Sequence, residues 1–417
     1  MFVTGIISEY NPFHNGHKYL IEQRKKHCPD SYFIAIMSGN FTQRGEIAIL
    51  NKWQRAELAV SNGIDLVLEL PFLFAVNSAE YFAKGAIAIL QKINCIDTLC
   101  FGSEYTDDEK LQEIARHALS DKFSISLKKY IGTGSSYASA CAKALSELSS
   151  VNEATLKAPN TILGIEYLKA CQKFKAPFKF DIIKRLKADH NDKTLNHSEN
   201  FASGTAIRNL LYTNHSNFSQ FKQLNQFVPK ETFTILNKIL QKNALPQEEN
   251  LFWPLMMKLR LAKLDDLNKI YRIREGLEYK LIKASQQATN RDDFLQKLKS
   301  KRYPQTNLQR ILLYTLLSIT KQQYANITSQ NALYARVLAF NDKGTHLLKK
   351  MKNFSEIPII DKTTKFLDSK KRCQANLTAL EEMLSIDTNA TELYNLCFNP
   401  PKYYGSDFTT TPVFVKK

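Results

Sequence analysis

The residues of this chain best placed to do chemistry are two histidines, His14 and His17, on either side of Gly16. An apolar run over residues 2–7 precedes them and is broken at Asn11-Pro12, so the segment predicts a strand, a turn and a helix. The first N–H groups of a helix carry partial positive charge, and Gly16 lets an anion approach them closely. Two imidazoles one helical turn apart reach the same side of that anion. The segment therefore predicts a phosphate site that stabilises charge growing in a transition state.

Two other interpretations of the histidine pair are open. A pair three residues apart also occurs on ordinary surface helices, and two imidazoles can bind a metal ion. The strand-turn-helix context favours the phosphate site. No third ligand stands nearby at a spacing familiar from zinc sites, so we predict no protein-bound metal.

The elements that must position these histidines follow from the alternation of strand and helix patterns over the first 190 residues. Such alternation predicts an α/β fold with a Rossmann-like, doubly wound parallel sheet, which binds ligands at the carboxyl ends of its strands. Residues 129–152 predict a loop around residues 132–136 followed by a helix. The expected strands are residues 32–37, 66–70, 98–101 and 178–186, and the expected helices are residues 52–61, 78–90 and 160–170.

After about residue 205 the strand signals fade, and we expect a mainly helical second part with its own core. Helices are predicted over residues 233–242, 255–267 and 308–319, with a short strand at residues 334–339 before a helix that begins near Gly344. The tail, residues 399–417, lacks helical periodicity and is expected to wrap or fray. The predicted domains are residues 1–205, a catalytic domain, and residues 206–417, a basic helical region.

Charge supports this division. Residues 1–200 contain 24 Lys and Arg against 22 Asp and Glu, a net charge of +2, whereas residues 201–417 contain 33 against 18, a net charge of +15. A near-neutral half joined to a strongly basic half indicates a catalytic domain with a polyanion-binding extension. No basic amphipathic helix with exposed aromatic residues is evident, which favours RNA or DNA over a membrane surface as the partner.

Cysteine use and hydropathy predict a cytoplasmic protein. The chain has seven cysteines without CxxC spacing, which favours reduced thiols, and Cys95 and Cys100 are expected to pack as small apolar residues. Residues 1–3 lead directly into the first strand without a basic leader. The longest apolar stretch, residues 311–317, is too short to cross a bilayer, so no membrane segment is predicted.

Further polar motifs follow the predicted strands. Residues 38–45 and 101–104 offer small and polar groups, and Gly102 leaves room for an adenine or a ribose. Asn160 opens a helix and either caps it or contacts ligand. Arg185 ends the last strand, and residues 203–208 start a helix in which Arg208 is either a ligand group or a solvated charge. Each motif is weak alone, and together they form a consistent nucleotide pocket.

The His14–His17 motif, with Ser-Gly-Thr-Ala-Ile-Arg at residues 203–208, resembles the HxGH nucleotidyltransferase superfamily. The longer strings at residues 5–17, 37–46 and 52–57 are more specific. They resemble the bacterial tRNA(Met) cytidine acetate ligase family, with similarity over most of the chain and strongest before residue 210. Residues 187–190 (Lys-Ala-Asp-His) depart from the small, glycine-bearing sequence that the family tends to have after the arginine at Arg185.

The resemblance implies an ATP-dependent ligase that makes N4-acetylcytidine at the wobble position of elongator tRNA(Met) from acetate, through an acetyl-adenylate. His14 and His17 would be catalytic and hold the α-phosphate, with Mg²⁺ bound through the phosphates. Phe13 and Phe41 are suggested for an acetate pocket. The ATP contacts implied are Ile7, Ser8, Glu9, Tyr10, Asn11, Pro12, Phe13, His14, Asn15, Gly16, His17, Lys18, Tyr19, Leu20, Gly102, Asn160 and Arg185.

Two rival functions remain open at this point. One is a nucleotidyltransferase that adenylylates a small phosphorylated metabolite, which leaves the basic half without a role. The other is a non-catalytic RNA-binding factor, which leaves both histidines without a role. Three basic clusters are candidates for contacting tRNA, although each cluster alone is also compatible with a solvated helix face. The first cluster is Lys297, Lys299, Lys301 and Arg302 with Tyr303, the second is Lys349, Lys350 and Lys352, and the third is Lys362, Lys365, Lys370, Lys371 and Arg372.

Overall fold

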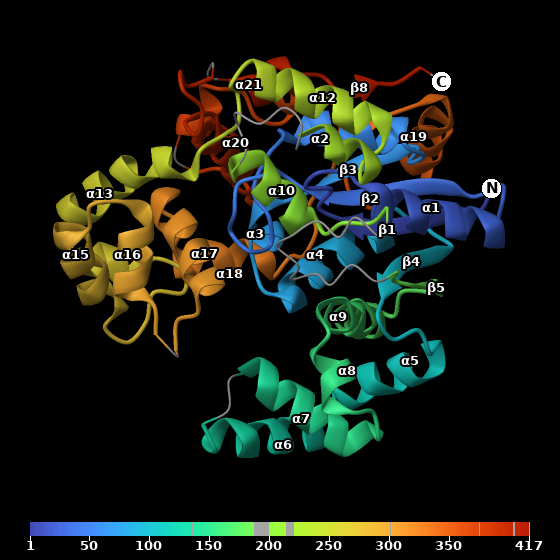
Figure 1. Ribbon diagram of the computed structural model, residues 1–417, viewed down its shortest axis with the longest axis horizontal. Helices are drawn as coiled ribbons and strands as arrows, with labels where there is room; N and C mark the ends of the chain where they lie inside the picture. The colour runs from blue at the N-terminus through green and yellow to red at the C-terminus, as the bar shows by residue number, and fades with distance from the viewer. Residues whose placement is uncertain are drawn as a thin grey trace.

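Within the residues that the structure describes, eight strands form one sheet at the centre of the molecule (Figure 1). The computed structural model describes residues 1–134, 137–186, 200–213, 221–300, 302–374, 376–402 and 405–416; the predicted features at residues 135–136, 187–190 and Lys301 lie outside these ranges. The strands are β1 (Val3–Ser8), β2 (Tyr32–Ser38), β3 (Leu66–Leu70), β4 (Thr98–Ser103), β5 (Lys179–Lys184), β6 (Ala335–Phe340), β7 (Ile359–Ile360) and β8 (Val413–Phe414).

The first five strands are parallel and lie in the order β5-β4-β1-β2-β3. Val3 of β1 stands opposite Tyr32 of β2, and Thr4 stands opposite Thr98 of β4. The order reverses direction between β1 and β4, and in doubly wound sheets ligands bind at such a switch point. The predicted α/β class and its parallel sheet are therefore confirmed.

Helices connect the strands and cover both faces of the sheet. Among the described residues, no helix combines the length and the apolar content that crossing a bilayer requires. The helices of the first half are α1 (Asn15–His27), α2 (Lys52–Ser61), α3 (Phe72–Ala75), α4 (Ala79–Lys92), α5 (Asp108–His117), α6 (Asp121–Gly132), α7 (Tyr137–Ser149), α8 (Glu153–Lys157) and α9 (Pro159–Phe174). Those of the second half are α10 (Gly204–Thr213), α12 (Lys230–Gln241), α13 (Phe252–Leu261), α14 (Leu264–Lys269), α15 (Leu277–Gln287), α16 (Arg291–Leu298), α17 (Gln305–Leu316), α18 (Lys321–Thr328), α19 (Asp342–Phe354), α20 (Ala379–Asn395) and α21 (Ser406–Thr409).

Alternation along β2 shows why both faces are covered. Phe33 and Ala35 pack into a core with α1, α2, α10 and α12, whereas Ile34 and Ile36 pack into a second core with α4 and α9. A strand with apolar residues on both faces is buried on both, as in parallel sheets generally. Figure 1 shows α2 and α12 on one side of the sheet and α4 and α9 on the other.

The second half of the chain is mainly helical, as predicted, and it also completes the sheet. The expectation that it has a core of its own is wrong, because Leu255 and Leu308 belong to the same core as Ile34 of β2. β6 pairs antiparallel with β3, and β7 and β8 pair with β6. The tail therefore wraps onto the sheet, while α13, α15, α16 and α17 gather in a separate group to one side (Figure 1). The division at residue 205 into a catalytic and an RNA-binding part stays a prediction, because a shared sheet does not test which part binds RNA.

Two helical predictions need correction. Residues 129–132 are the last turn of α6 rather than part of a loop, and the following helix is α7. The single helix expected over residues 255–267 is two helices, α13 and α14, separated where Ala262 is extended (φ −73°, ψ 144°). Apolar periodicity could not reveal that break, because buried leucines continue on both sides of it, Leu259 before and Leu267 after.

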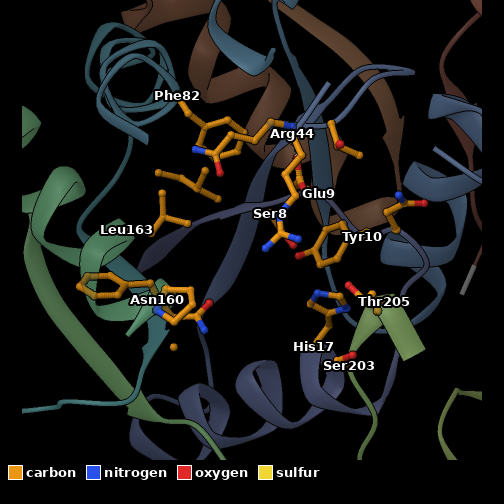
Figure 2. A pocket seen from close by; sticks show the side chains of 18 of the residues that line it. Ser8, Glu9, Tyr10, His17, Arg44, Phe82, Asn160, Leu163, Ser203 and Thr205 are labelled. Carbon is orange, nitrogen blue, oxygen red and sulfur yellow. The ribbon is translucent and has the colours of Figure 1, made fainter. Parts of the chain in front are cut away.

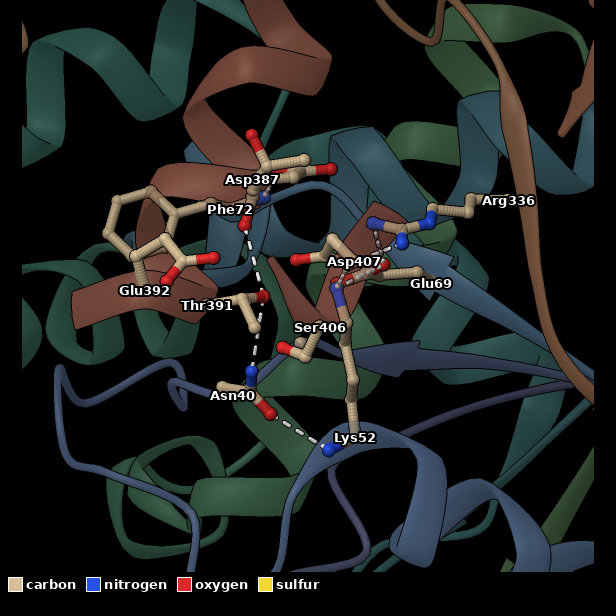
Figure 3. Close-up of polar contacts among 12 residues, drawn as sticks. Asn40, Lys52, Glu69, Phe72, Arg336, Asp387, Thr391, Glu392, Ser406 and Asp407 are labelled. Atoms are coloured by element: carbon tan, nitrogen blue, oxygen red, sulfur yellow. Dashed lines mark hydrogen bonds and ion pairs between the residues drawn. The ribbon is translucent and has the colours of Figure 1, made fainter. Parts of the chain in front are cut away.

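A buried ionic network ties the tail to the first half of the chain (Figure 3). Lys52 at the start of α2 pairs with Glu69 of β3 at 2.9 Å and with Asp407 of α21 at 2.7 Å. Arg336 of β6 pairs with the same two carboxylates. The four side chains are at most 4% exposed. Two cations and two anions balance, so each buried charge has partners that offset its desolvation.

Asp407→Asn is expected to destabilise the fold by roughly 3–5 kcal/mol, because it leaves a buried cation uncompensated. Urea unfolding followed by circular dichroism measures the loss. Asp266→Asn is the matched control: Asp266 pairs with Lys269 at 3.0 Å, both exposed, and its loss is expected to cost about 0.5 kcal/mol or less. Equal costs for the two variants would contradict a structural role of the network.

Candidate active site

A cavity of about 260 Å³ opens at the carboxyl ends of β1 and β4, at the switch point of the sheet. The loop after β2 and the first turns of α9 and α10 complete its wall. Figure 2 shows His17, Ser203 and Thr205 together at one end and Phe82 toward the other. Asn160 and Leu163 lie across the cavity from Ser8, the last residue of β1, and from Tyr10 in the turn that follows it. The cavity therefore has a polar end at α1 and a more apolar end at α4 and α9.

His14 and His17 close a reciprocal capping box at the start of α1. His14 is the N-cap residue, and its Nδ1 accepts a hydrogen bond from the Gly16 N–H at 3.1 Å. The His14 N–H donates to Nδ1 of His17 at 3.2 Å, and the two rings stack with centroids 3.8 Å apart. A Cβ at residue 16 would stand 3.0 Å from the His14 ring, so glycine allows the box to close. In the common capping box a serine or threonine and a glutamate or glutamine make these reciprocal hydrogen bonds, and here two imidazoles make them.

The box fixes the protonation of both rings. Each Nδ1 accepts from a backbone N–H, so in the neutral imidazole the proton is on Nε2. Burial, together with repulsion from the Arg185 guanidinium and from His14 whenever that ring is protonated, holds the pKa of His17 well below its usual 6.5, which keeps this ring neutral at neutral pH. His17 therefore presents an N–H donor without carrying a charge.

The predicted site residues divide by position. Gly16 and Tyr19 line a small adjoining hollow of about 40 Å³, which shares His14, Leu20, Gly102 and Arg185 with the main cavity. Eleven predicted residues line the main cavity; they are Ile7, Ser8, Glu9, Tyr10, Asn11, His14, His17, Leu20, Gly102, Asn160 and Arg185. That these residues contact ATP stays a prediction.

The other predicted contacts lie outside both hollows. Phe13 is fully buried and packs against Tyr10 with ring centroids 5.0 Å apart, and Pro12 is buried beside it. The Asn15 amide donates to the carbonyl of Asn200 and to that of Gln226, and the second of these bonds links α1 to the second half of the chain. Lys18 is exposed on α1. Phe13 and Phe41, suggested for an acetate pocket, are both buried in the core.

Of the two interpretations of Asn160, the one in which it caps its helix is wrong. The N-cap of α9 is Ala158, and the capping carboxylate comes from Glu104, after β4. Glu104 accepts from the Asn160 side chain at 2.6 Å and from the Thr161 N–H at 2.8 Å. Although burial opposes ionisation, these hydrogen bonds and the charge of Arg185 lower the pKa of Glu104.

Arg185 lies at the edge of the cavity next to Gly102. A Cβ at residue 102 would stand 3.3 Å from Cγ of Arg185, so the glycine makes room for the arginine stem. Burial lowers the pKa of Arg185, opposed by the charge of Glu104, and a guanidinium stays charged after such a shift. Arg185 is therefore a fixed cation on the wall of the cavity.

Arg208 is a tethered side chain rather than a solvated helix charge. It donates to the Asn11 carbonyl at 2.8 Å and pairs with Glu46 at 3.4 Å. Gly204 permits this approach of α10 to the turn after β1, since a Cβ there would stand 3.1 Å from the Asn11 oxygen. The motif at residues 203–208 thus joins the second half of the chain to the histidine segment.

Several cavity residues were not identified from the sequence. The aromatic and aliphatic side chains Phe82, Leu163 and Tyr167 come from α4 and α9, where their helical spacing indicated only a core face. Arg55 belongs to the motif at residues 52–57, but the sequence assigned it no role. It is fully buried and donates to the carbonyls of Leu50, Ser38, Gly39 and Glu9, which fixes the strand ends at the cavity.

The described side chains around the cavity do not form a metal-binding cage of their own. Among the described residues, no group of three or more His, Cys, Asp and Glu side chains could hold a metal ion. The cavity therefore suits Mg²⁺ only if phosphate oxygens and water supply most of the ligands of the ion, which is how Mg²⁺ binds with nucleotides. Mg²⁺ stays a prediction.

This chain is similar to known proteins over nearly its whole length. The model of the HIGH Nucleotidyl Transferase family matches residues 1–407. The tRNA(Met) cytidine acetate ligase of Alkaliphilus metalliredigens is 36% identical, with 100% of both chains covered. That of Caldanaerobacter subterraneus is 38% identical, covering 95% of this chain and 96% of the relative.

Two solved crystal structures have the same fold as this chain. The apo crystal structure of Thermotoga maritima TmcAL has a TM-score of 0.89 at 31% identity, and the form bound with alpha-thio ATP has a TM-score of 0.87 at 31% identity, each covering 100% of both chains. Sequence likeness and fold likeness thus extend over the whole length of the chain. The chain belongs to the HIGH nucleotidyl transferase family, among the tRNA(Met) cytidine acetate ligases.

Proposed function

We propose that this protein is an ATP-dependent ligase that acetylates the wobble cytidine of elongator tRNA(Met) at N4, using acetate and forming an acetyl-adenylate. The observation that carries the proposal is the imidazole pair locked at the N-terminus of α1, on the wall of the switch-point cavity. Full-length likeness to tRNA(Met) cytidine acetate ligases, and to a structure bound with alpha-thio ATP, supports it.

In the first step the acetate carboxylate attacks the α-phosphorus of ATP, and pyrophosphate leaves. The protein positions the reactants and stabilises charge. His14 and His17 donate from Nε2 toward the α-phosphate oxygens, at the positive end of the α1 helix dipole. Arg185 faces the β- and γ-phosphates. Phe82 and Leu163 give the opposite end of the cavity an apolar surface.

In the second step the cytidine N4 amine attacks the acetyl carbonyl and AMP leaves. The base must be unstacked to enter the cavity, which is easier in an anticodon loop than in a duplex. The basic second half is the proposed tRNA surface.

The basic clusters differ in how far they are already neutralised. In the first, Lys297 pairs with Asp293 at 2.6 Å and Arg302 pairs with Glu275. In the third, Lys365 pairs with Asp361 at 2.7 Å and Lys371 pairs with Glu381. These pairs reduce the charge that clusters one and three offer to phosphate groups, so the net charge of the whole half supports RNA binding better than any one cluster does.

The function is tested by incubating the protein with tRNA(Met), ATP and isotopically labelled acetate, then digesting the tRNA and measuring nucleoside masses. Labelled N4-acetylcytidine is the expected product. A tRNA(Met) transcript with uridine at the wobble position is the matched control and should stay unmodified. Transfer of AMP to phosphopantetheine instead of to acetate would favour the metabolite-adenylylating alternative.

His17→Asn is expected to lower the rate of ATP–pyrophosphate exchange with acetate by about 10²–10³-fold, because it removes one donor from the charged transition state. Asn replaces the Nδ1 acceptor with Oδ1, so the capping box persists. The melting temperature is therefore expected to change little.

His346→Asn, at an exposed position of α19, is the matched control and should leave exchange unchanged. Intact exchange in His17→Asn would contradict the role given to this ring. A large fall in melting temperature together with lost exchange would mean that His17 acts through the fold.

Binding of tRNA is expected to weaken steeply with salt. If four lysines or arginines contact phosphates, the affinity should fall by roughly 100-fold between 50 and 200 mM salt. Filter binding or fluorescence anisotropy over that range measures the slope. A flat response would show that the excess of cations in residues 201–417 does not contact RNA.

A further inference from the structure

The acetyl-transfer step needs a proton acceptor. The N4 amine of cytidine is a weak nucleophile, and once it bonds to the acetyl carbon it must lose a proton. Two carboxylates, Glu9 and Glu46, are among the described residues that line the cavity, together with the two histidines and the phenols of Tyr10 and Tyr167. These six groups are the candidates.

Five of them are already committed or unsuitable. The capping box occupies Nδ1 of both His14 and His17, so the remaining ring nitrogen carries a proton in the neutral form and cannot accept another. Burial raises the pKa of both Tyr10 and Tyr167, so neither phenol is ionised at neutral pH. Glu46 is paired with the Arg208 guanidinium at 3.4 Å.

Glu9 is held differently. It follows directly on β1, and the main-chain N–H of Gln43 donates to its Oε1 at 2.6 Å. Its carbonyl accepts from the buried Arg55, so the residue is fixed at both backbone and side chain. Its neighbour Tyr10 turns the chain with φ 47° and meets the His17 ring edge to face, 4.9 Å between centroids. Glu9 therefore shares the cavity wall with the phosphate-binding rings (Figure 2).

We infer that Glu9 is the general base of acetyl transfer, an inference that rests on the proposed function. Its carboxylate removes the proton from N4 as the amine bonds to the acetyl carbon. The bond between that carbon and the AMP phosphate oxygen then breaks, AMP leaves with the electron pair, and the proton passes from Glu9 to solvent. Atoms and charge balance without a further reactant.

The electrostatic surroundings suit this role. Burial raises the pKa of Glu9, and the Gln43 N–H opposes the rise. The charged groups that face it are the cations Arg208, Arg55 and Arg310 and the carboxylate Glu46, with the phenol of Tyr167 near by. A raised pKa makes the carboxylate a better proton acceptor.

Glu9→Gln separates the two half-reactions. The amide oxygen can still accept from Gln43, so the fold and the first step should persist. ATP–pyrophosphate exchange with acetate is expected to fall at least about tenfold less than transfer does, because exchange needs no proton acceptor. Single-turnover transfer from preformed acetyl-adenylate to tRNA(Met) is expected to fall by about 10²-fold or more. The exposed Glu22→Gln on α1 is the matched control and should leave both rates unchanged.

The pH profile gives a second readout that a merely structural role would not move. In the wild type, transfer should slow as the pH falls through the raised pKa of Glu9, above its ordinary 4.5, and in Glu9→Gln this limb should vanish. Unchanged transfer in Glu9→Gln, an unchanged acid limb, or equal losses in exchange and transfer would each overturn the assignment. Failure of the wild type to exchange pyrophosphate would instead contradict the proposed function itself.

Discussion

The reciprocal hydrogen bonds between His14 and His17 at the first turn of α1 are the constraint on which the site depends. A helix N-terminus needs acceptors for its free N–H groups, and here the acceptors are the rings that the chemistry uses. Satisfying the backbone therefore also sets the tautomer of both rings. Protonation at Nδ1 would place a donor against a donor, so the low pKa of His17 and the closed box support each other.

The rest of the molecule holds this turn and its surroundings in place. The loop after β2, which carries Gln43 to Glu9, is anchored at Asn40: its side chain accepts from the Lys52 N–H at 2.8 Å and donates to Thr391 of α20 at 3.2 Å. Lys52 is also the centre of the buried ionic network with the tail. The last hundred residues thus stabilise the wall of a cavity built mainly by the first two hundred, which explains why one sheet includes strands from both.

Much of the fold and part of the site could be predicted from the sequence. The strands of the first half carry uninterrupted apolar runs, and the box motif is local, so both follow from neighbouring residues. The pairing of β6 with β3 and the docking of Asp407 could not be predicted, because they join positions hundreds of residues apart. The same holds for Glu104, which caps α9 from the loop after β4, and for Phe82 and Leu163, whose helical spacing fits a core equally well. Glu9 was among the expected ATP contacts, but its separate role depends on partners that only the fold brings near.

The most direct test of the central claim is nitrogen-15 NMR of the imidazole rings, with and without a non-hydrolysable ATP analogue. At neutral pH we expect the His17 ring to be neutral, with Nδ1 unprotonated and Nε2 protonated, and His14 to have the same tautomer. Both Nε2–H signals should shift when the analogue binds. Protonated Nδ1 in either ring, or ring signals that ignore the analogue, would contradict the claim that the capping box prepares these side chains to bind phosphate.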